Sequence, residues 1–99
     1  PIAPDEYRWT DGALRFFQDD YSGALAQFQA MRDPEPAARL AAAAAAMAGE
    51  RDIAAQFRNT VLANCPDFTV SGWMKVMPQR GRRHAELYSE ALRRAGFPQ

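Results

Sequence analysis

Residues 36–66 decide the fold, and they read PAARLAAAAAAMAGERDIAAQFRNTVLANCP. An almost pure alanine segment comes first, Gly49 follows it, and an amphipathic segment then runs to Pro66. Alanine side chains let two antiparallel helices approach closely, and a glycine between them supplies a left-handed turn conformation. Proline ends the second helix, because the residue before a proline avoids helical backbone angles. The stretch therefore predicts one helix–turn–helix unit.

The spacing inside this unit fits a hairpin of the tetratricopeptide type. If Ala54 is the small residue early in the second helix, Gly49 lies five positions before it and Pro66 lies twelve positions after it, as that repeat requires. Residues 20–34 repeat the pattern more loosely, and Ala24 precedes Ala54 by 30 positions, somewhat less than the usual period of about 34. We therefore expect an all-α fold made of two tetratricopeptide-like helical hairpins, a fragment of an α-solenoid, with a C-terminal capping helix.

Apolar residues recur at three- and four-residue steps through most of the chain, which is the period of an amphipathic helix. No segment alternates as a strand would. Gly96 ends the last helix, with Pro98 two positions beyond it. A final helix of this kind can cover the apolar flank that a stack of hairpins leaves exposed. The expected helices are 5–18, 21–31, about 36–48, 52–64, a short helix or irregular arm at 68–77, and 82–95.

The length of 99 residues suits one domain with a modest core. We expect residues 1–66 to form the two hairpins and residues 67–99 to form the arm and the capping helix. Residues 1–50 carry four Arg and eight acids, and residues 51–99 carry eight Lys or Arg and four acids, so the halves have net charges of −4 and +4. Attraction between two copies, giving a homodimer, is one expectation, whereas the balanced total charge argues against a nucleic-acid partner.

Cysteine usage and hydropathy indicate the compartment. Cys65 is the single cysteine, so no intrachain disulfide can form, and we expect a cytoplasmic protein. The alanine run is too short and too weakly hydrophobic to span a membrane, so a membrane is not an expected partner. The chain begins with a proline, which we interpret as the start of a fragment excised from a longer protein.

We expect no catalytic, cofactor-binding or metal-binding group in this chain. A metal site needs several converging His or Cys ligands, and the chain has one residue of each type. None of the serines has the neighbours of an activated nucleophile, and the isolated glycines form no phosphate loop. His84 is interpreted as a half-buried packing residue, and the adjacent Asp19 and Asp20 as helix-capping residues.

The tail carries a more specific pattern than the repeats do. It reads PDFTV at 66–70, ELY at 86–88 and EALRRAGFP at 90–98. This tail resembles the C-terminal end of bacterial adenylate/guanylate cyclase-related proteins and tetratricopeptide-containing regulators. Members of that family close the last repeat with Pro-Asp-Phe and end in a motif of the Leu-Arg-Lys-Ala-Gly-Leu-Pro type. The resemblance covers about residues 12–99.

This resemblance implies a role as well as a fold. In the family the cyclase or DNA-binding domain lies upstream, so the resemblance implies that this chain is the C-terminal, noncatalytic interaction or scaffold part of a larger bacterial signalling protein, such as an adenylate cyclase. The first repeat departs from the family's pattern at three positions. Asp19 stands where glycine is usual, and Arg8 and Arg15 stand where aromatic or large apolar residues are usual.

We expect the functional surface to be a peptide-binding groove, because tetratricopeptide stacks present a concave face. An aromatic side chain, a cation and small residues together suit a peptide that carries a carboxylate. A second interpretation stays open, in which Trp9 and Phe16 pack against the tail or against a missing upstream repeat. The expected partner is a protein or peptide, or an upstream domain of the same chain. The groove candidates are Glu6, Trp9, Ala13 and Phe16 from the first hairpin, and Arg39, Ala43 and Ala46 from the second.

A basic segment before the last helix offers an alternative partner. Lys75, Arg80, Arg82 and Arg83 could contact phosphates, and Trp73 beside them could stack on a base. The plainer interpretation is a solvated turn, with Trp73 tucked against the repeats. The expected function is therefore binding of a protein or peptide, and nucleic-acid or anion contact through residues 75–83 is the alternative.

Overall fold

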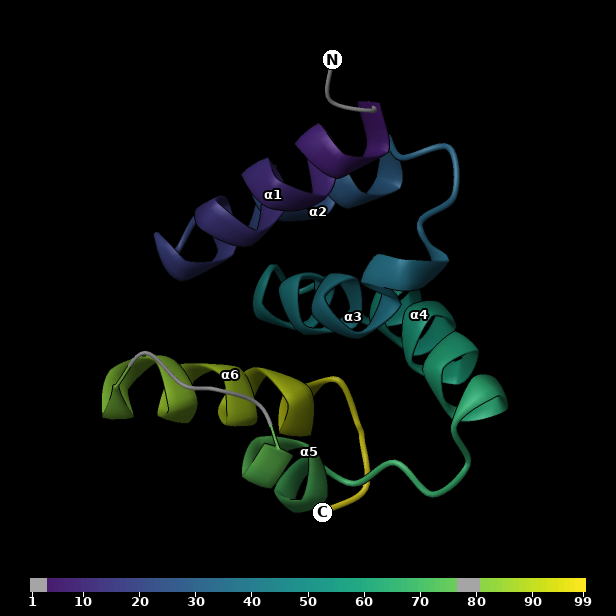
Figure 1. The fold of residues 1–99 in the computed structure, drawn as a ribbon, viewed down its shortest axis with the longest axis vertical. Helices are drawn as coiled ribbons and strands as arrows, with labels where there is room; N and C mark the ends of the chain where they lie inside the picture. Colours follow the sequence, from purple (N-terminus) through teal and green to yellow (C-terminus); the bar gives the residue numbers. More distant parts are fainter. Residues whose placement is uncertain (1–3, 77–80) are drawn as a thin grey trace.

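The computed structural model describes residues 4–76 and 81–99 (Figure 1). Residues next to the helix ends determine where each helix begins and stops. All regular structure in those ranges is helical, which confirms the all-α prediction. Each expected helix is present, with its ends shifted by at most a few residues, and the expected arm contains a short helix whose predicted end at residue 77 lies outside the described ranges. The elements are α1 (Pro4–Phe17), α2 (Tyr21–Gln29), the 3-10 turn η1 (Glu35–Ala37), α3 (Ala38–Met47), α4 (Arg51–Asn64), α5 (Val70–Val76) and α6 (Arg82–Arg94).

Three of these helices end with a residue in the left-handed conformation. Asp19 follows α1 with φ of 64°, Gly49 follows α3 with 83°, and Gly96 follows α6 with 93°. In each case the next backbone N–H donates to the carbonyl five residues before it, which satisfies a group that the helix end would otherwise leave unpaired. These N···O distances are 2.9 Å for Asp20 to Arg15, 2.8 Å for Glu50 to Ala45 and 3.2 Å for Phe97 to Leu92.

The α1–α2 hairpin is closed by a cap and by a close approach. Asp20 caps α2, as expected, because its Oδ1 accepts the backbone N–H of Gly23 at 3.0 Å. Gly12 of α1 is buried, and a Cβ added there would lie 2.6 Å from Cε1 of Phe28. A residue without a side chain at this position therefore lets the fully buried Phe28 ring pack directly on the backbone of α1.

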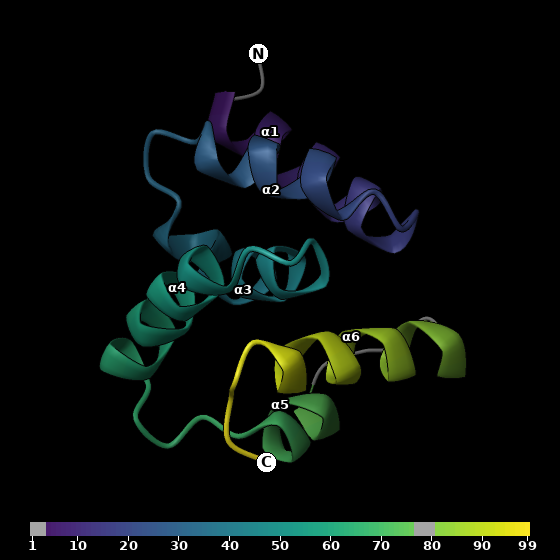
Figure 2. The ribbon, with the colours of Figure 1, turned by 180° about the vertical axis from the view of Figure 1, so that it is seen from behind.

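The alanine helix α3 is the central element of the fold. Figures 1 and 2 show α1 and α2 on one side of it and α5 and α6 on the other, with α4 alongside. Its main packing partners are α4, α2 and α6. Residues 41–45 are all alanine, and each has no exposed surface. Because methyl groups are small, three helices can approach one central helix at once, and this explains how an alanine run forms a core.

The residues after α4 form a C-terminal unit, here defined as residues 68–76 and 81–99. Phe68 packs against Phe97 of the tail, with ring centroids 5.0 Å apart. The backbone N–H of Val70 donates to the carbonyl of Pro98 at 2.8 Å, so the chain end lies against the start of α5. Phe97 is 4% exposed and Leu92 is fully buried. The last residues of the chain are therefore packed inside this unit, against the start of α5.

Candidate functional site

The predicted groove residues lie along α1 and α3, and their exposure divides them into two groups. At the N-terminal end of α1, Glu6 is exposed and Trp9 is 43% exposed. Phe16, two turns further along, and Ala43 of α3 are fully buried. The remaining candidates are partly buried, and these are Ala13, Arg39 and Ala46.

Tyr88 of α6 occupies the middle of the predicted groove. Its ring lies 6.0 Å from Phe16 and 6.3 Å from Phe17, centroid to centroid, and only 6% of the residue is exposed. A peptide cannot reach Phe16 while α6 stays in this place, and Ala43 has no exposed surface. Of the two interpretations given for Phe16, packing against the tail is the one that the structure bears out. Repeat spacing could not reveal this, because it describes the hairpins and says nothing of where the last helix packs.

Arg39, the predicted cation of the groove, is already engaged by the C-terminal unit. Its Nε donates to the Tyr88 hydroxyl at 3.2 Å, and its guanidinium carbon lies 3.6 Å from the centroid of the Trp73 ring. This second distance is well within the range of a cation–π interaction. Burial raises the pKa of the Tyr88 phenol above its ordinary value, and the neighbouring Arg39 cation opposes that rise. The three side chains join α3, α5 and α6.

The predicted anion-binding residues have separate positions. Lys75 and Arg82 are exposed, and Arg80 lies outside the described residues. Arg83 Nη2 approaches Asp19 Oδ2 at 3.5 Å, and both side chains are largely exposed, so this ion pair contributes little. The Trp73 ring lies under the Arg39 guanidinium, and its centroid is 6.0 Å from that of the Phe68 ring. Stacking of Trp73 on a base would therefore require Arg39 to move.

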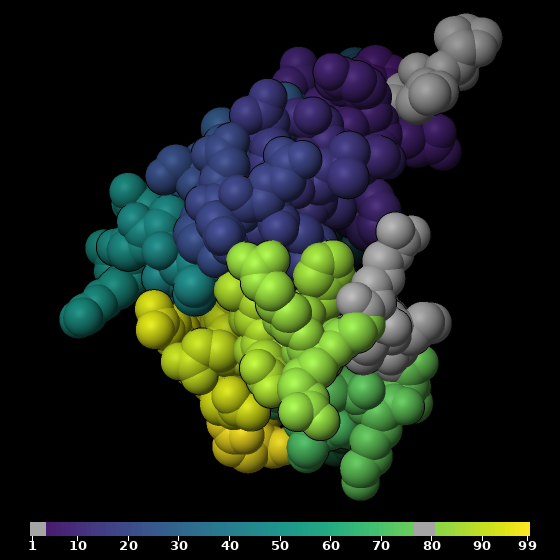
Figure 3. All heavy atoms as spheres, turned by 90° about the vertical axis from the view of Figure 1, so that its left-hand side faces the viewer, coloured from purple at the N-terminus to yellow at the C-terminus, as the bar shows by residue number. Residues whose placement is uncertain are grey.

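His84 packs as the sequence indicated. It is half-buried, and its ring stacks on Phe17 with 4.5 Å between centroids and 23° between planes. This stack joins the first turn of α6 to the last turn of α1. Figure 3 shows the N-terminal half of α6, in light green, against the end of the α1–α2 hairpin.

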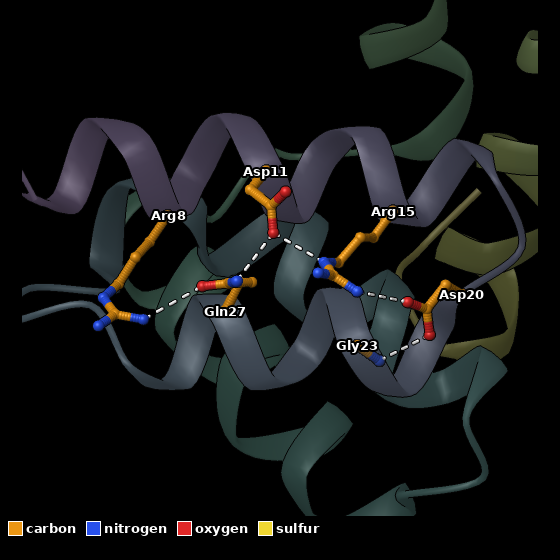
Figure 4. A network of polar contacts seen from close by, with 6 residues as sticks. All are labelled: Arg8, Asp11, Arg15, Asp20, Gly23 and Gln27. Atoms are coloured by element: carbon orange, nitrogen blue, oxygen red, sulfur yellow. Dashed lines mark hydrogen bonds and ion pairs between the residues drawn. The ribbon is translucent and has the colours of Figure 1, made fainter. Parts of the chain in front are cut away.

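A ladder of polar side chains runs between α1 and α2, and the sequence analysis did not find it (Figure 4). Arg8 and Arg15 both belong to this ladder. The four-residue spacing from Asp11 to Arg15 was the available signal. The donor–acceptor distances are 3.2 Å for Arg8 to Gln27, 2.8 Å for Gln27 to Asp11, 2.7 Å for Arg15 to Asp11 and 2.9 Å for Arg15 to Asp20.

This ladder has electrostatic consequences. The Arg15 guanidinium, followed by the Gly23 N–H, lowers the pKa of the Asp20 carboxyl. Asp11, followed by Asp20, raises the pKa of Arg15. Polar side chains thus line one side of α1, and hydrogen bonds hold α1 and α2 together there, in addition to the Phe28 contact.

One pocket of about 490 Å³ lies where η1, the start of α3 and the end of α4 meet. Its walls mix charged, polar and apolar groups, and the exposed Cys65 thiol is at its edge. Within residues 4–76 and 81–99 no group of three or more His, Cys, Asp or Glu side chains is placed to hold a metal ion. The lining residues are Asp33, Glu35, Pro36, Ala38, Arg39, Thr60, Val61, Asn64 and Cys65.

Comparison with known proteins gives no relative: no family model, curated protein or solved structure matches this chain. In the part of the chain that the structure describes, none of the helices has the length and apolar character needed to cross a lipid bilayer.

Proposed function

We propose that this chain is a noncatalytic protein-interaction module of the tetratricopeptide type, and that α1 carries its binding surface. Two successive antiparallel hairpins, α1–α2 and α3–α4, support the repeat interpretation, since α2 packs on α3 between them. The left-handed Gly49 at the second turn supports it too. The module binds a peptide or protein partner. If the chain is part of a larger protein, an upstream domain of that protein is an alternative partner.

The observation that carries this proposal is the exposure of three large apolar side chains on one helix. Tyr7 is 61% exposed, Trp9 is 43% exposed and Leu14 is 58% exposed. Tyr7 and Leu14 are seven residues apart, so they lie on the same face of α1, two turns from each other. Trp9, two residues after Tyr7, lies on the other side of the helix, so α1 offers exposed apolar groups on two faces. Exposed apolar groups mark interaction sites, and aromatic residues dominate the binding energy of such sites.

Trp9 has a particular position on this helix. It continues the stripe of Ala13 and Phe16, but it lies beyond the part of that stripe that Tyr88 covers. The accessible remainder of the predicted groove is therefore its N-terminal end, with Trp9 as the aromatic group and Glu6 as a neighbouring charge. An apolar peptide side chain packing on Trp9, with a basic group near Glu6, suits this surface.

The experiment is a selection of peptides from a displayed random library on the whole chain. We expect the selected peptides to lose about 30-fold in affinity when Trp9 is replaced by Ala, which corresponds to about 2 kcal/mol at a central aromatic contact. Gln56→Ala, at an exposed position of α4 outside the proposed surface, is the control and should leave the affinity unchanged. Peptides that bind a Tyr7→Ala, Trp9→Ala, Leu14→Ala triple variant as tightly as the natural chain would exclude α1 as the binding surface.

The cyclase connection rests on the tail motif alone, and we propose it as the larger context. The segment EALRRAGFP at residues 90–98 would belong to the regulatory part of a signalling protein whose catalytic domain lies upstream. The coding sequence before residue 1 tests this directly. A cyclase domain there agrees with the proposal, and an open reading frame without one removes it.

Anion or nucleic-acid contact is the second candidate, favoured by the exposure of Lys75, Arg82 and Arg83 on both sides of one short connection. Contacts with phosphates release counterions, so binding of a single-stranded oligonucleotide should weaken steeply as salt rises. Replacing Arg82 and Arg83 by Ala should reduce the slope of that salt dependence by roughly one to two. Fluorescence anisotropy that shows no binding at low salt would dismiss this candidate.

A further inference from the structure

The C-terminal unit packs against the rest of the chain and is connected to it by a short exposed linker. We call residues 4–64 the body. The two parts are joined by residues 65–67, which are all exposed, and the main packing partners of α4 are α3 and η1 rather than α5. This connection, which runs between the end of α4 and the start of α5 (Figures 1 and 2), contains a turn at Pro66 and Asp67, in which the backbone N–H of Phe68 donates to the carbonyl of Cys65 at 3.1 Å.

The C-terminal unit also has internal contacts of its own. Phe68 packs on Phe97 and near Trp73, and the tail hydrogen-bonds to the start of α5. Because these contacts begin at residue 68, the whole unit can move as one piece about the linker without losing them.

The surface between the body and the unit is specific. The Phe17–His84 stack and the Arg39–Tyr88 hydrogen bond have been described, and Arg58 Nη1 adds a hydrogen bond to the carbonyl of Ala95 at 3.2 Å. Tyr88 of α6 is 6% exposed and also lies against Phe16 of α1, with 6.0 Å between ring centroids. Aromatic, apolar and hydrogen-bonding contacts therefore all select the same docked position.

Charge favours the same encounter. Residues 1–64 carry six Arg and nine acids, a net charge of −3, and residues 68–99 carry six Lys or Arg and two Glu, a net charge of +4. Opposite charges on two surfaces accelerate their association, and this holds whether the two surfaces belong to one chain or to two.

We propose that the C-terminal unit exchanges between two copies of this chain, giving a symmetric dimer in which each unit docks on the body of the other copy. Every contact described above is kept in that dimer, and only the linker at residues 65–67 changes its path. Exchange of an identical element is a low-cost way to form a dimer. This inference does not depend on peptide binding by α1, because Tyr7 and Leu14 are outside the exchanged surface.

Concentration sets which form is present. A short flexible linker gives an effective concentration in the mM range, so the closed monomer predominates in dilute solution. The exchanged dimer should therefore form when the chain is unfolded and refolded at about 1 mM, and it should be nearly absent after refolding at about 10 μM.

The test uses a 1:1 mixture of ¹³C-labelled and unlabelled whole chains, mixed in denaturant and refolded at the higher concentration. Isotope-filtered NOE spectra of the isolated dimer should show contacts between chains from Phe17 to His84 and from Phe16 to Tyr88. The same mixture refolded at the lower concentration is the control and should show none. A chain that sediments only as a monomer at about 1 mM, or a dimer without these interchain contacts, would overturn the proposal.

A linker variant gives an independent readout. Deleting Pro66 and Asp67 shortens the exposed linker, so that docking within one chain is blocked while docking between chains is still possible. This variant should be mainly dimeric at about 10 μM, whereas the control with both residues replaced by Ala keeps the length and should stay monomeric. A native-like monomer from the deletion variant would contradict the proposal. If the deletion variant does not fold, the NOE experiment on the natural chain decides.

Discussion

At the scale of single residues, Asp19 explains why the first turn forms without a glycine. It adopts the left-handed conformation that Gly49 and Gly96 adopt after two other helices. Asp tolerates this region better than most residues because its short side chain can hydrogen-bond locally. Here the carboxylate accepts the hydroxyl of Tyr21 at 2.9 Å. The first turn thus has the same left-handed backbone conformation as the two glycine turns.

Substitutions at Asp19 test this backbone conformation. Gly and Ala both remove the carboxylate, but only Gly adopts positive φ without a steric cost. Asp19→Gly should therefore be more stable than Asp19→Ala by about 1 kcal/mol, measured by urea denaturation. Equal stability of the two variants would show that φ at this position is not positive in solution.

Asp5 gives the fold a dependence on acid. Its carboxylate accepts the backbone N–H groups of Arg32 at 2.7 Å and Asp33 at 3.1 Å, and so joins the start of α1 to the segment after α2. These two bonds, that from Arg32 first, lower the pKa of Asp5 below its ordinary value of 3.8. Because the folded pKa is the lower one, the stabilisation is complete at pH well above 3.8 and is lost as pH falls below it, through the folded value.

The corresponding prediction concerns Asp5→Asn. This variant should lower the melting temperature at neutral pH, and the difference from the natural chain should shrink as the pH falls below 3.8. Thermal melts followed by circular dichroism across that range measure it. A difference that stays constant with pH would mean that the two hydrogen bonds do not form in solution.

At the scale of elements, the ends of the helices could be predicted from the sequence, but the helices that each one packs against could not. Gly49, Gly96 and Pro66 act on the backbone next to them, so the sequence predicted these ends closely. The placement of α6 depends on contacts such as Tyr88 with Phe16, between residues far apart in the chain. Local spacing contains no such information, and for that reason the predicted groove included Phe16 and Ala43, which are core residues.

The alanines of α3 supply a prediction of packing. Ala42 and Ala45 have no exposed surface, so Leu at either position must push a neighbouring helix away and should cost about 1 to 3 kcal/mol. Ala63→Leu in α4 is the matched control, since Ala63 is exposed and a surface change is worth about 0.5 kcal/mol or less. Chemical denaturation measures all three, and equal stabilities would contradict close packing around α3.

At the scale of the whole molecule, α3 lies between two layers and packs against both. The α1–α2 hairpin and the C-terminal unit lie on opposite sides of it, and they contact each other chiefly where α1 ends and α6 begins (Figure 3). The opposite net charges of the chain halves, which the sequence showed, agree with this arrangement. The polar ladder of Arg8 and Arg15 was not predicted, because its Gln27 member is on another helix.

Native-state hydrogen exchange, followed residue by residue by NMR on the whole chain, tests the central role of α3 most directly. A helix enclosed on several sides opens only when the molecule unfolds, so the amides of residues 42–47 should exchange with the full free energy of unfolding. The amides near the end of α4, which is more exposed, should exchange faster. Amides of α3 that exchange as fast as those at the end of α4 would contradict the account.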